Sequence, residues 1–268
     1  MAKSKFTKAE ERYIKKLARG KLVEYMKLND VIGHQIFSIL NMESRVLYYP
    51  FEDQQVWGFS ETVKGIPFVC INTSLSYDKQ VFAAAHELYH IWFGRKADII
   101  LSETEEEIDE AEDTEKYASR FAAEFLVNEE LLYQEMDVYG VDSENIEIKD
   151  VLKLADIFVV PYRTMVKRLY ETGNISENEE EKLEDVSEKE LDIWKRRLGI
   201  SVPDRRDFLS LGNLTDKAVS LYERNLITYE KLEYLLGLSD ISPVEMGIRK
   251  KREYVPCSDD ELDRIMEE

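Results

Sequence analysis

The sequence predicts an α+β fold, in which a mostly helical domain with a small β-sheet precedes an all-helical C-terminal extension. Runs rich in β-branched and aromatic residues are confined to residues 45–72, whereas apolar residues recur at helical spacing before and after them. Hydrophobic residues make up 44% of the 268 residues, which is enough to bury one large core, or one core and a smaller one.

The N-terminal region is expected to form two helices. Thr7 and Glu10 have the spacing of a capping box, and apolar residues follow them at helical spacing. Asn29 or Asp30 can cap a second helix, whose apolar positions lie within residues 31–40.

Three strands are predicted after these helices. β-Branched and aromatic residues dominate the segments RVLYY (45–49), QVWGFSE (55–61) and IPFVCIN (66–72), and Lys64-Gly65 can form the turn between the last two. Cys70, in the third segment, is expected to be a small buried hydrophobic residue.

Helices are predicted for most of the remaining chain. Ser76 can cap a helix that Gly94 ends, and a polar, acidic connection over residues 97–113 leads to the next helix. The further helical segments are 114–127, 129–136, a pair over 148–173 that meets near Val160-Pro161, and three or four short helices over 208–248.

Charge and composition suggest the domain organisation. We expect a domain over residues 1–175, a charged linker over residues 176–190, and a helical regulatory or partner-binding region over residues 191–268. The formal net charge is −19, so direct binding to nucleic acid, a polyanion, is not expected. The only compact basic run is RKKR, at residues 249–252.

The sequence also bears on the compartment. No apolar run is long enough to span a membrane, and the N-terminus has no apolar stretch typical of a secretory signal. Two cysteines, Cys70 and Cys257, do not make a disulfide framework, so a reducing cytoplasm is expected.

The segment AAAHELYHIWFG, residues 83–94, holds two of the three histidines in the chain. On a helix, His86 and His90 lie one turn apart on the same face, so both rings can bind one metal ion. Glu87 lies beside that site and can act as a general base toward a water molecule there. His34 has no ligand partner near it in sequence and is expected to be a core or surface residue.

A zinc site of this type needs a third protein ligand from another element. In the segment EKYASRFAAEFL, Glu115 falls about 50° from the centre of the apolar stripe, at about 100° per residue. Glu124 and Asp113 fall toward the outer side. An acid in phase with a buried face needs compensation, which a metal would provide, so Glu115 is the predicted third ligand.

Four segments, whose order and spacing along the chain agree with the family, carry a resemblance to the ImmA/IrrE family of zinc metallopeptidases. The segment GIPFVCINTSLSYDKQVFAAAHELYHIWFG resembles the strand, Asn-containing turn and H-E-x-x-H helix of that family, and EKYASRFAAEFLVN resembles its second motif. LADIFVVPYRTMVKRLYETG is similar to the next helix pair, and IFSILNMESRVLYYPFEDQQVWGFS to the entry of the fold. The resemblance covers about residues 5–175; one departure is the absence of a Met-Pro pair in LVNEELL.

This resemblance implies a zincin-like, gluzincin-like domain in which His86, His90 and Glu115 bind Zn²⁺ and Glu87 is the catalytic base. Tyr117, Tyr133 and Tyr162 are all candidates for the group that stabilises the oxyanion. The strand IPFVCIN could be an edge that pairs with a substrate peptide, or an interior strand.

The resemblance also implies a substrate. Characterised relatives cleave helix-turn-helix repressors of mobile elements, phages or stress and defence loci, so we expect a separate Xre-like repressor as partner. The alternative is a zinc-stabilised, non-catalytic module that binds a partner in a toxin–antitoxin or phage regulatory system.

Overall fold

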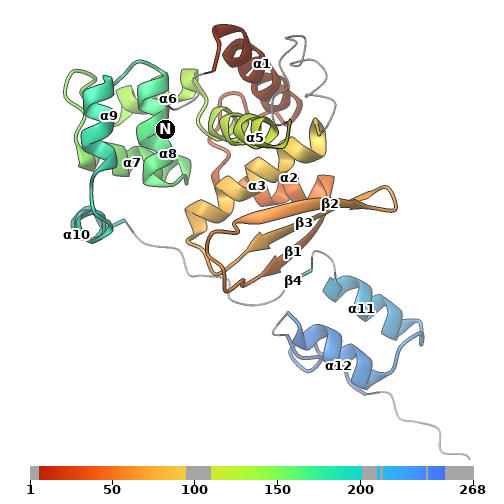
Figure 1. The fold of residues 1–268 in the computed structure, drawn as a ribbon. Helices are drawn as coiled ribbons and strands as arrows, with labels where there is room; N and C mark the ends of the chain where they lie inside the picture. Colours follow the sequence, from red (N-terminus) through yellow and green to blue (C-terminus); the bar gives the residue numbers. More distant parts are fainter. Residues whose placement is uncertain (1–5, 95–109, 201–209, 212–213, 240, 251–268) are drawn as a thin grey trace, which may run out of the picture. The chain divides into compact units, whose positions relative to one another are not determined.

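The structure is a computed structural model that describes residues 6–94, 110–200, 210–211, 214–239 and 241–250 (Figure 1). The chain divides into two compact units, Met1–Gly212 and Asn213–Glu268. Residues 97–109 of the predicted acidic connection and residues 251–268 of the predicted C-terminal region lie outside the described residues.

The first unit has the predicted α+β fold, with many helices and a small sheet. Its helices are α1 (Lys8–Glu24), η1 (Gly33–Gln35), α2 (Ile36–Glu43), α3 (Tyr77–Trp92), α5 (Glu110–Leu126), α6 (Glu129–Val138), α7 (Ile148–Phe158), α8 (Tyr162–Glu171), α9 (Glu177–Glu184) and α10 (Glu188–Leu198). Among the described residues, none of these helices combines the length and the apolar character that crossing a membrane requires.

The sheet has the order β2-β3-β1-β4, with strands β1 (Arg45–Tyr49), β2 (Gly58–Val63), β3 (Ile66–Asn72) and β4 (Ser210–Leu211). β3 pairs with β2 in antiparallel and with β1 in parallel orientation, so it is an interior strand, and β2 forms one edge. Lys64 and Gly65 have φ of 52° and 79°, the left-handed conformation that tight hairpin turns require, as predicted for this turn. β4, which pairs with β1, was predicted as part of a helical region.

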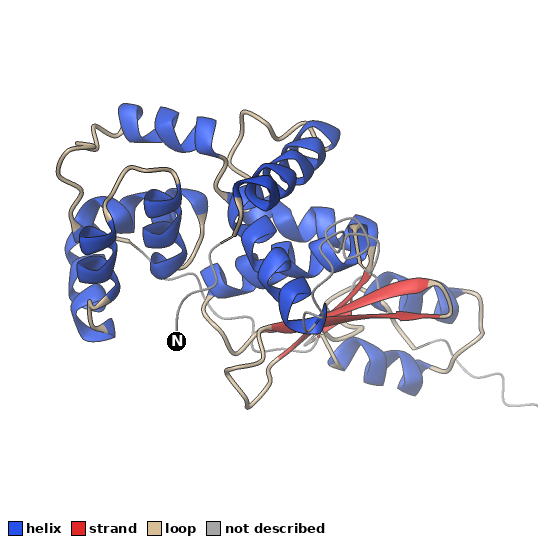
Figure 2. Ribbon diagram, turned by 45° about the horizontal axis from the view of Figure 1, so that its top comes forward, coloured by secondary structure: helices blue, strands red, loops and turns tan. Residues whose placement is uncertain are grey.

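Side-chain alternation explains which face of the sheet is covered. Val46, Tyr48, Val69 and Ile71 are buried, whereas their neighbours Tyr49 and Phe68 are exposed. α2 and α3 pack on the buried face, and α5 and α1 follow beyond α3 (Figures 1 and 2). The core therefore lies between the sheet and the helix that carries both histidines of the H-E-x-x-H pattern.

The two N-terminal helices differ in how well the sequence predicts them. α1 begins with the predicted capping box, in which Thr7 and Glu10 bond reciprocally. The predicted cap at Asn29 or Asp30 is wrong, because α2 begins only at Ile36. Gly33, with φ of 42°, adopts a left-handed backbone that an α-helix cannot continue through.

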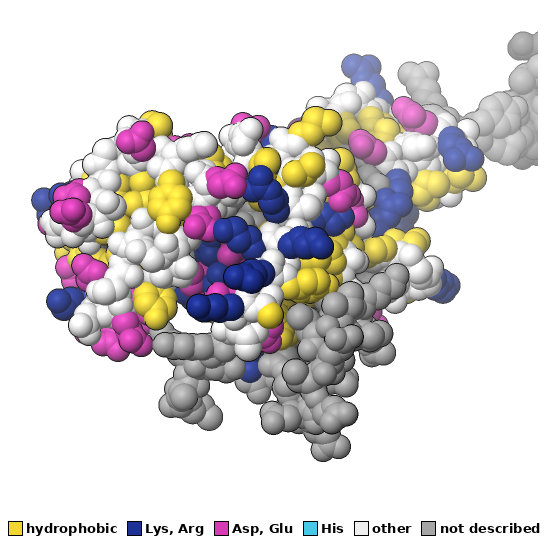
Figure 3. All heavy atoms as spheres, turned by 90° about the horizontal axis from the view of Figure 1, so that it is seen from above, with side chains coloured by type: hydrophobic (Ala, Val, Ile, Leu, Met, Phe, Trp, Pro, Cys, Tyr) yellow, Lys and Arg dark blue, Asp and Glu magenta, His cyan; other side chains and the backbone are white. Residues whose placement is uncertain are grey.

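Basic side chains gather on the face that includes α1 (Figure 3). Within α1, the exposed basic residues recur every three or four positions, as Lys8, Arg12, Lys15, Lys16 and Arg19. Lys15 pairs with Glu129, and Arg19 pairs with Glu130 at 2.7 Å, so this face also ties α1 to the start of α6. A basic surface is thus present in a strongly acidic chain.

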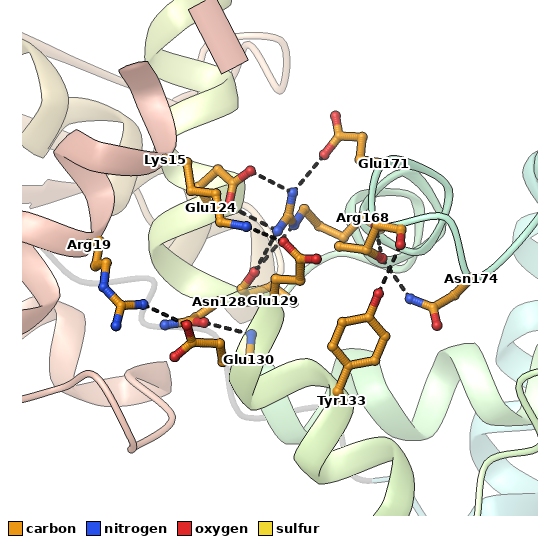
Figure 4. A network of polar contacts seen from close by, with 12 residues as sticks. Lys15, Arg19, Glu124, Asn128, Glu129, Glu130, Tyr133, Arg168, Glu171 and Asn174 are labelled. Atoms are coloured by element: carbon orange, nitrogen blue, oxygen red, sulfur yellow. Dashed lines mark hydrogen bonds and ion pairs between the residues drawn. The ribbon is translucent and has the colours of Figure 1, made fainter. Parts of the chain in front are cut away.

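A buried ion cluster joins α5 to α8 (Figure 4). Arg168, whose side chain is 1% exposed, donates to both carboxylate oxygens of Glu124 at 3.0 Å and to the Val127 carbonyl oxygen at 3.0 Å. Arg120 and Glu171 complete the cluster. The prediction that Glu124 faces outward is wrong: Glu124 is buried, and Arg168 reaches it from α8 and supplies the compensating charge.

The division between the units lies further along the chain than the predicted one. Much of the predicted linker, residues 176–190, is helical, because Ser176 and Ser187 cap α9 and α10, and these helices pack on α8 and α7. The second unit contains α11 (Leu214–Glu223) and α12 (Tyr229–Gly237), whose small core includes Ala218, Tyr222, Leu232 and Leu236. The regulatory role of residues 191–268 stays a prediction.

Candidate metal centre

α3 presents the two histidines at the edge of the core. Ser76 is the N-cap, as predicted, and Ala83–Ala85 are buried, so the small alanine side chains let the helix pack closely on its neighbours. The side chains of His86 and His90 are 16% and 20% exposed. They are therefore fixed in position by packing yet reachable from a cavity.

The structure brings the three predicted ligands together. The Nε2 atom of His86 lies 3.0 Å from Glu115 Oε2 and 3.2 Å from His90 Nε2, and His90 Nε2 lies 3.4 Å from Glu115 Oε1. One ligand atom from each residue lies within 4.8 Å of the other two. Two imidazoles and one carboxylate are a donor set that suits zinc with a fourth, open position, so these residues fit the predicted ion. Their role as ligands stays a prediction.

Glu115 occupies the expected place for a different reason than the sequence suggested. Its side chain is 63% exposed, so it lies at the rim of the site and not in a buried stripe. The hydrogen bond to His86 holds the pKa of its carboxyl group below the usual value, against a smaller opposing effect of burial. Glu115 is therefore ionised at neutral pH, as a metal ligand must be.

Glu87 is the buried acid of the site, with 5% of its surface exposed. Burial raises the pKa of its carboxyl group, while a hydrogen bond with Ser60 of β2 and the neighbouring His86 act in the opposite direction. A carboxylate with a raised pKa beside a reaction site is suited to accept and return a proton.

Two residues near Glu87 and His86 were not predicted from the sequence. Ser60 bonds to Glu87 from β2, and Ser119 Oγ lies 3.3 Å from His86 Nδ1, on the ring side opposite Glu115. Side chains that bond the second nitrogen of a ligating histidine fix its ring orientation. Ser119 follows Glu115 by four residues, so helical spacing was a signal that could have identified it.

Gly58 allows β2 to approach the site closely. A Cβ atom at this position would lie 2.9 Å from the Cys70 carbonyl oxygen and 3.5 Å from Cγ of Glu87. Real Cβ atoms essentially never lie 2.9 Å from another heavy atom, so a larger residue here would displace the strand.

The buried Asn72 fixes the loop that leads into β2. Its side chain accepts from the Phe51 amide at 3.0 Å and donates to the carbonyl oxygens of Asp53 and Val56 at 3.1 and 2.7 Å. This loop forms a wall of the metal centre, so the Asn-containing turn shapes the site although it lies outside it.

A cavity of about 670 Å³ opens at the metal centre. The four predicted residues line it together with Ser119 and residues 55–60 of β2 and its preceding loop. Among the described residues β2 is an edge strand, and its residues 58–60 line the cavity, so backbone groups that are unpaired within the described sheet lie beside it. The predicted alternative, that IPFVCIN is an edge strand, is wrong, because β1 and β2 cover both of its sides.

None of the three candidate tyrosines lines this cavity. Tyr117 bonds to Glu10 of α1, Tyr133 donates to the Thr172 carbonyl oxygen at 2.9 Å, and Tyr162 lines a different cavity. His34 is exposed and its ring lies against Tyr77, away from the metal centre. The oxyanion-stabilising role therefore has no support among these tyrosines.

Comparisons with known proteins place part of the chain in a known family. The family model for M78 peptidases, described as the IrrE N-terminal-like domain, matches residues 41–170, which confirms the resemblance to the ImmA/IrrE family and includes all four predicted site residues. No curated protein matches the chain. Among solved structures, a Mycobacterium tuberculosis transcriptional regulator is similar, with a TM-score of 0.44 and 12% identity. The match covers 61% of this chain and 47% of that one, so this chain spans less than half of that protein.

Proposed function

Residues 41–170 belong to the family of IrrE N-terminal-like M78 peptidases, and from this premise we propose that the chain is a zinc-dependent endopeptidase. The observation that carries the proposal is the meeting of His86, His90 and Glu115 in one cavity with the buried Glu87. Two histidines, one glutamate and an adjacent glutamate base are the groups that peptide hydrolysis at a zinc ion requires.

In the proposed peptide hydrolysis, each residue of the site would have its own role. Zinc, held by His86, His90 and Glu115, would supply a Lewis acid and make a nearby water molecule more acidic. Glu87 accepts a proton from the attacking water and passes it to the leaving amine. Ser60 holds the Glu87 carboxylate by a hydrogen bond.

An extended peptide suits the site. The free edge of β2 can pair with a substrate backbone in the manner of an added strand, while the side chains of the peptide enter the cavity. Such pairing recognises any extended backbone, so selectivity would come from the cavity and from surfaces outside it.

For the substrate, we propose a separate Xre-like helix-turn-helix repressor of a mobile element, phage or stress and defence locus. The support is the resemblance to the ImmA/IrrE family, together with a net charge of −19, which favours a basic DNA-binding partner. Cleavage would relieve repression in the cytoplasm.

The test is co-expression of the chain with candidate Xre-like repressors, chosen first among the proteins encoded near it. Wild type should cleave the repressor, whereas Glu87→Gln should retain zinc and fold but lose turnover by about 10²–10⁴-fold, the typical contribution of general-base catalysis. Glu177→Gln, at an exposed position of α9, is the matched control and should cleave like wild type.

Zinc content is measured separately by elemental analysis. His86→Ala, His90→Ala and Glu115→Ala should each lose the ion. If these variants keep zinc, the ligand assignment is wrong. If wild type binds zinc and the repressor but never cuts it, the non-catalytic binding module becomes the better interpretation.

A further inference from the structure

A second cavity, of about 280 Å³, lies at the other end of α3 and shares no lining residue with the metal centre. Its walls come from η1, the first turn of α3, the corner between α7 and α8, and α10. Binding pockets for drug-sized ligands start at about 300 Å³, so this cavity suits a smaller molecule.

The cavity combines charges of both signs with apolar walls. Lys195 supplies a positive charge, and Asp78 and Asp156 supply negative charges. Burial raises the pKa of Asp156, and the charges of His34 and Lys195 only partly oppose this effect. Asp156 is exposed and lines the cavity, so its carboxylate can meet a cation there.

Tyr162 is the buried polar group of this cavity. The residue is 7% exposed, and its hydroxyl has no hydrogen-bond partner in the part of the chain that the structure describes. Burial raises the pKa of the phenol, so it stays protonated and can donate a hydrogen bond. Buried hydroxyls nearly always find a partner. The Tyr162 hydroxyl is itself closed to solvent, so a ligand could provide that partner where it displaces the cavity wall at Tyr162.

The backbone at the wall of the cavity is strained. Val159 has φ of 55°, which is a rare conformation for a β-branched residue. Gly33 packs against it: a Cβ on Gly33 would lie 3.1 Å from Cγ2 of Val159. Strained residues of this kind persist where the surroundings fix them, and they cluster at ligand sites.

Two helices start at the cavity without a side-chain cap, although Asp78 lies in the first turn of α3. Ser76 caps α3 without a side-chain hydrogen bond, and α8 begins after Pro161, which also provides no such bond. The first amides of a helix are free donors, and the helix dipole adds positive potential there.

We propose that this cavity binds a small α-amino acid with an apolar side chain. The carboxylate would lie at the start of α3 near Lys195, and the ammonium group would meet Asp156. The side chain would pack against Leu152 and Ala155. A phosphate is disfavoured because Asp78 and Asp156 would repel a second negative charge.

The position of the site suggests a regulatory role. His34, Lys195 and Ile200 line the cavity but lie outside the family match at residues 41–170, so segments flanking the peptidase domain complete the cavity. A bound amino acid would tie these segments to α3, the helix that carries His86 and His90. Any effect on cleavage rests on the proposed function, whereas binding itself does not.

The experiment measures binding to the full, zinc-loaded chain by calorimetry, with L-leucine, L-valine and L-methionine as separate probes. Isocaproate, which is leucine without its amino group, and isopentylamine, which is leucine without its carboxylate, are the matched controls. At least one amino acid should bind, and isocaproate and isopentylamine should each bind at least tenfold more weakly than the amino acid that binds most tightly.

Three variants locate the site. Tyr162→Phe removes one hydrogen bond and should weaken binding about tenfold, and Asp156→Asn and Lys195→Met should weaken it at least as much. Tyr133→Phe, whose hydroxyl bonds to Thr172 outside the cavity, should have no effect.

Zinc content and thermal unfolding show whether each variant is folded. The proposal is overturned if none of the amino acids binds, or if isocaproate binds as tightly as L-leucine. Unchanged binding by folded Tyr162→Phe and Asp156→Asn would overturn it equally, because the ligand would then lie elsewhere.

Discussion

Removing Arg168 should destabilise the first unit strongly, and the structure gives the size of the effect. The cluster holds two guanidinium groups and two carboxylates, so its net charge is zero, and all four side chains are 1–10% exposed. Arg168→Met leaves one uncompensated negative charge in this buried region. It also removes the donors to the Val127 carbonyl oxygen.

Removing one partner of a buried ion pair typically costs about 3–5 kcal/mol. Arg120 still bonds to Glu124 at 2.9 Å and pairs with Glu171 in the variant, so we expect the lower end, about 3 kcal/mol. Since domains are stable by only about 5–15 kcal/mol, this loss is a large fraction of the total.

Equilibrium unfolding in urea, followed by far-ultraviolet circular dichroism, measures the change. Lys15→Met is the matched control, because it breaks an exposed pair with Glu129 and should cost about 0–1 kcal/mol. The double variant Arg168→Met/Glu124→Leu, which removes both charges, should be more stable than Arg168→Met alone. If Arg168→Met is no worse than Lys15→Met, the cluster does not hold α5 to α8.

Three further predictions concern the metal centre. Ser119→Ala should lower zinc affinity by about 10–100-fold in a chelator competition, because the His86 ring loses its orienting bond; unchanged affinity would contradict that role. Gly58→Ala should cost about 1–3 kcal/mol in urea unfolding, because its Cβ would lie 2.9 Å from a β3 carbonyl oxygen, whereas Gly20→Ala, with no atom within 4 Å, should cost nothing. In metal-free protein, burial raises the pKa of Glu87, so the free energy of unfolding falls as pH rises through that pKa. Glu87→Gln should therefore be more stable than wild type at neutral pH, and this difference should disappear below the ordinary pKa of 4.5. A difference in stability that stays constant across pH would refute this reasoning.

The sequence predicted the local elements of the metal centre because each has a short-range signal. The H-E-x-x-H spacing places two histidines on one helical face, and the capping residues Thr7 and Ser76 mark helix starts. Glu115 was predicted from helical phase, and the structure brings it to the histidines. The exposed side chain of Glu115 shows that helical phase can identify the face of α5 on which a residue lies, but not whether that face is buried.

Long-range partners were not predictable in the same way. Glu124 was predicted to face outward because no local sequence pattern indicates that Arg168, 44 residues later, contacts that side of α5. Ser60 reaches Glu87 only through the pairing of β2, and β4 was missed because two residues carry too little periodicity to identify a strand. The basic face of α1 was not predicted, because its basic residues recur at helical spacing and do not form one consecutive run.

Two connected paths link the second cavity to the metal centre. The first is α3 itself: Tyr77 lines the cavity and His86 follows nine residues later, about 14 Å along one rigid helix. The second begins at Tyr162 in the first turn of α8, continues through Arg168 to Glu124, and ends at Glu115 on the same helix as Glu124. Because the two paths end at predicted ligands from different helices, a molecule that shifts α3 relative to α8 would alter the distance between the histidines and Glu115. The Arg168 cluster would then both stabilise the fold and transmit the position of α8 to the predicted third ligand.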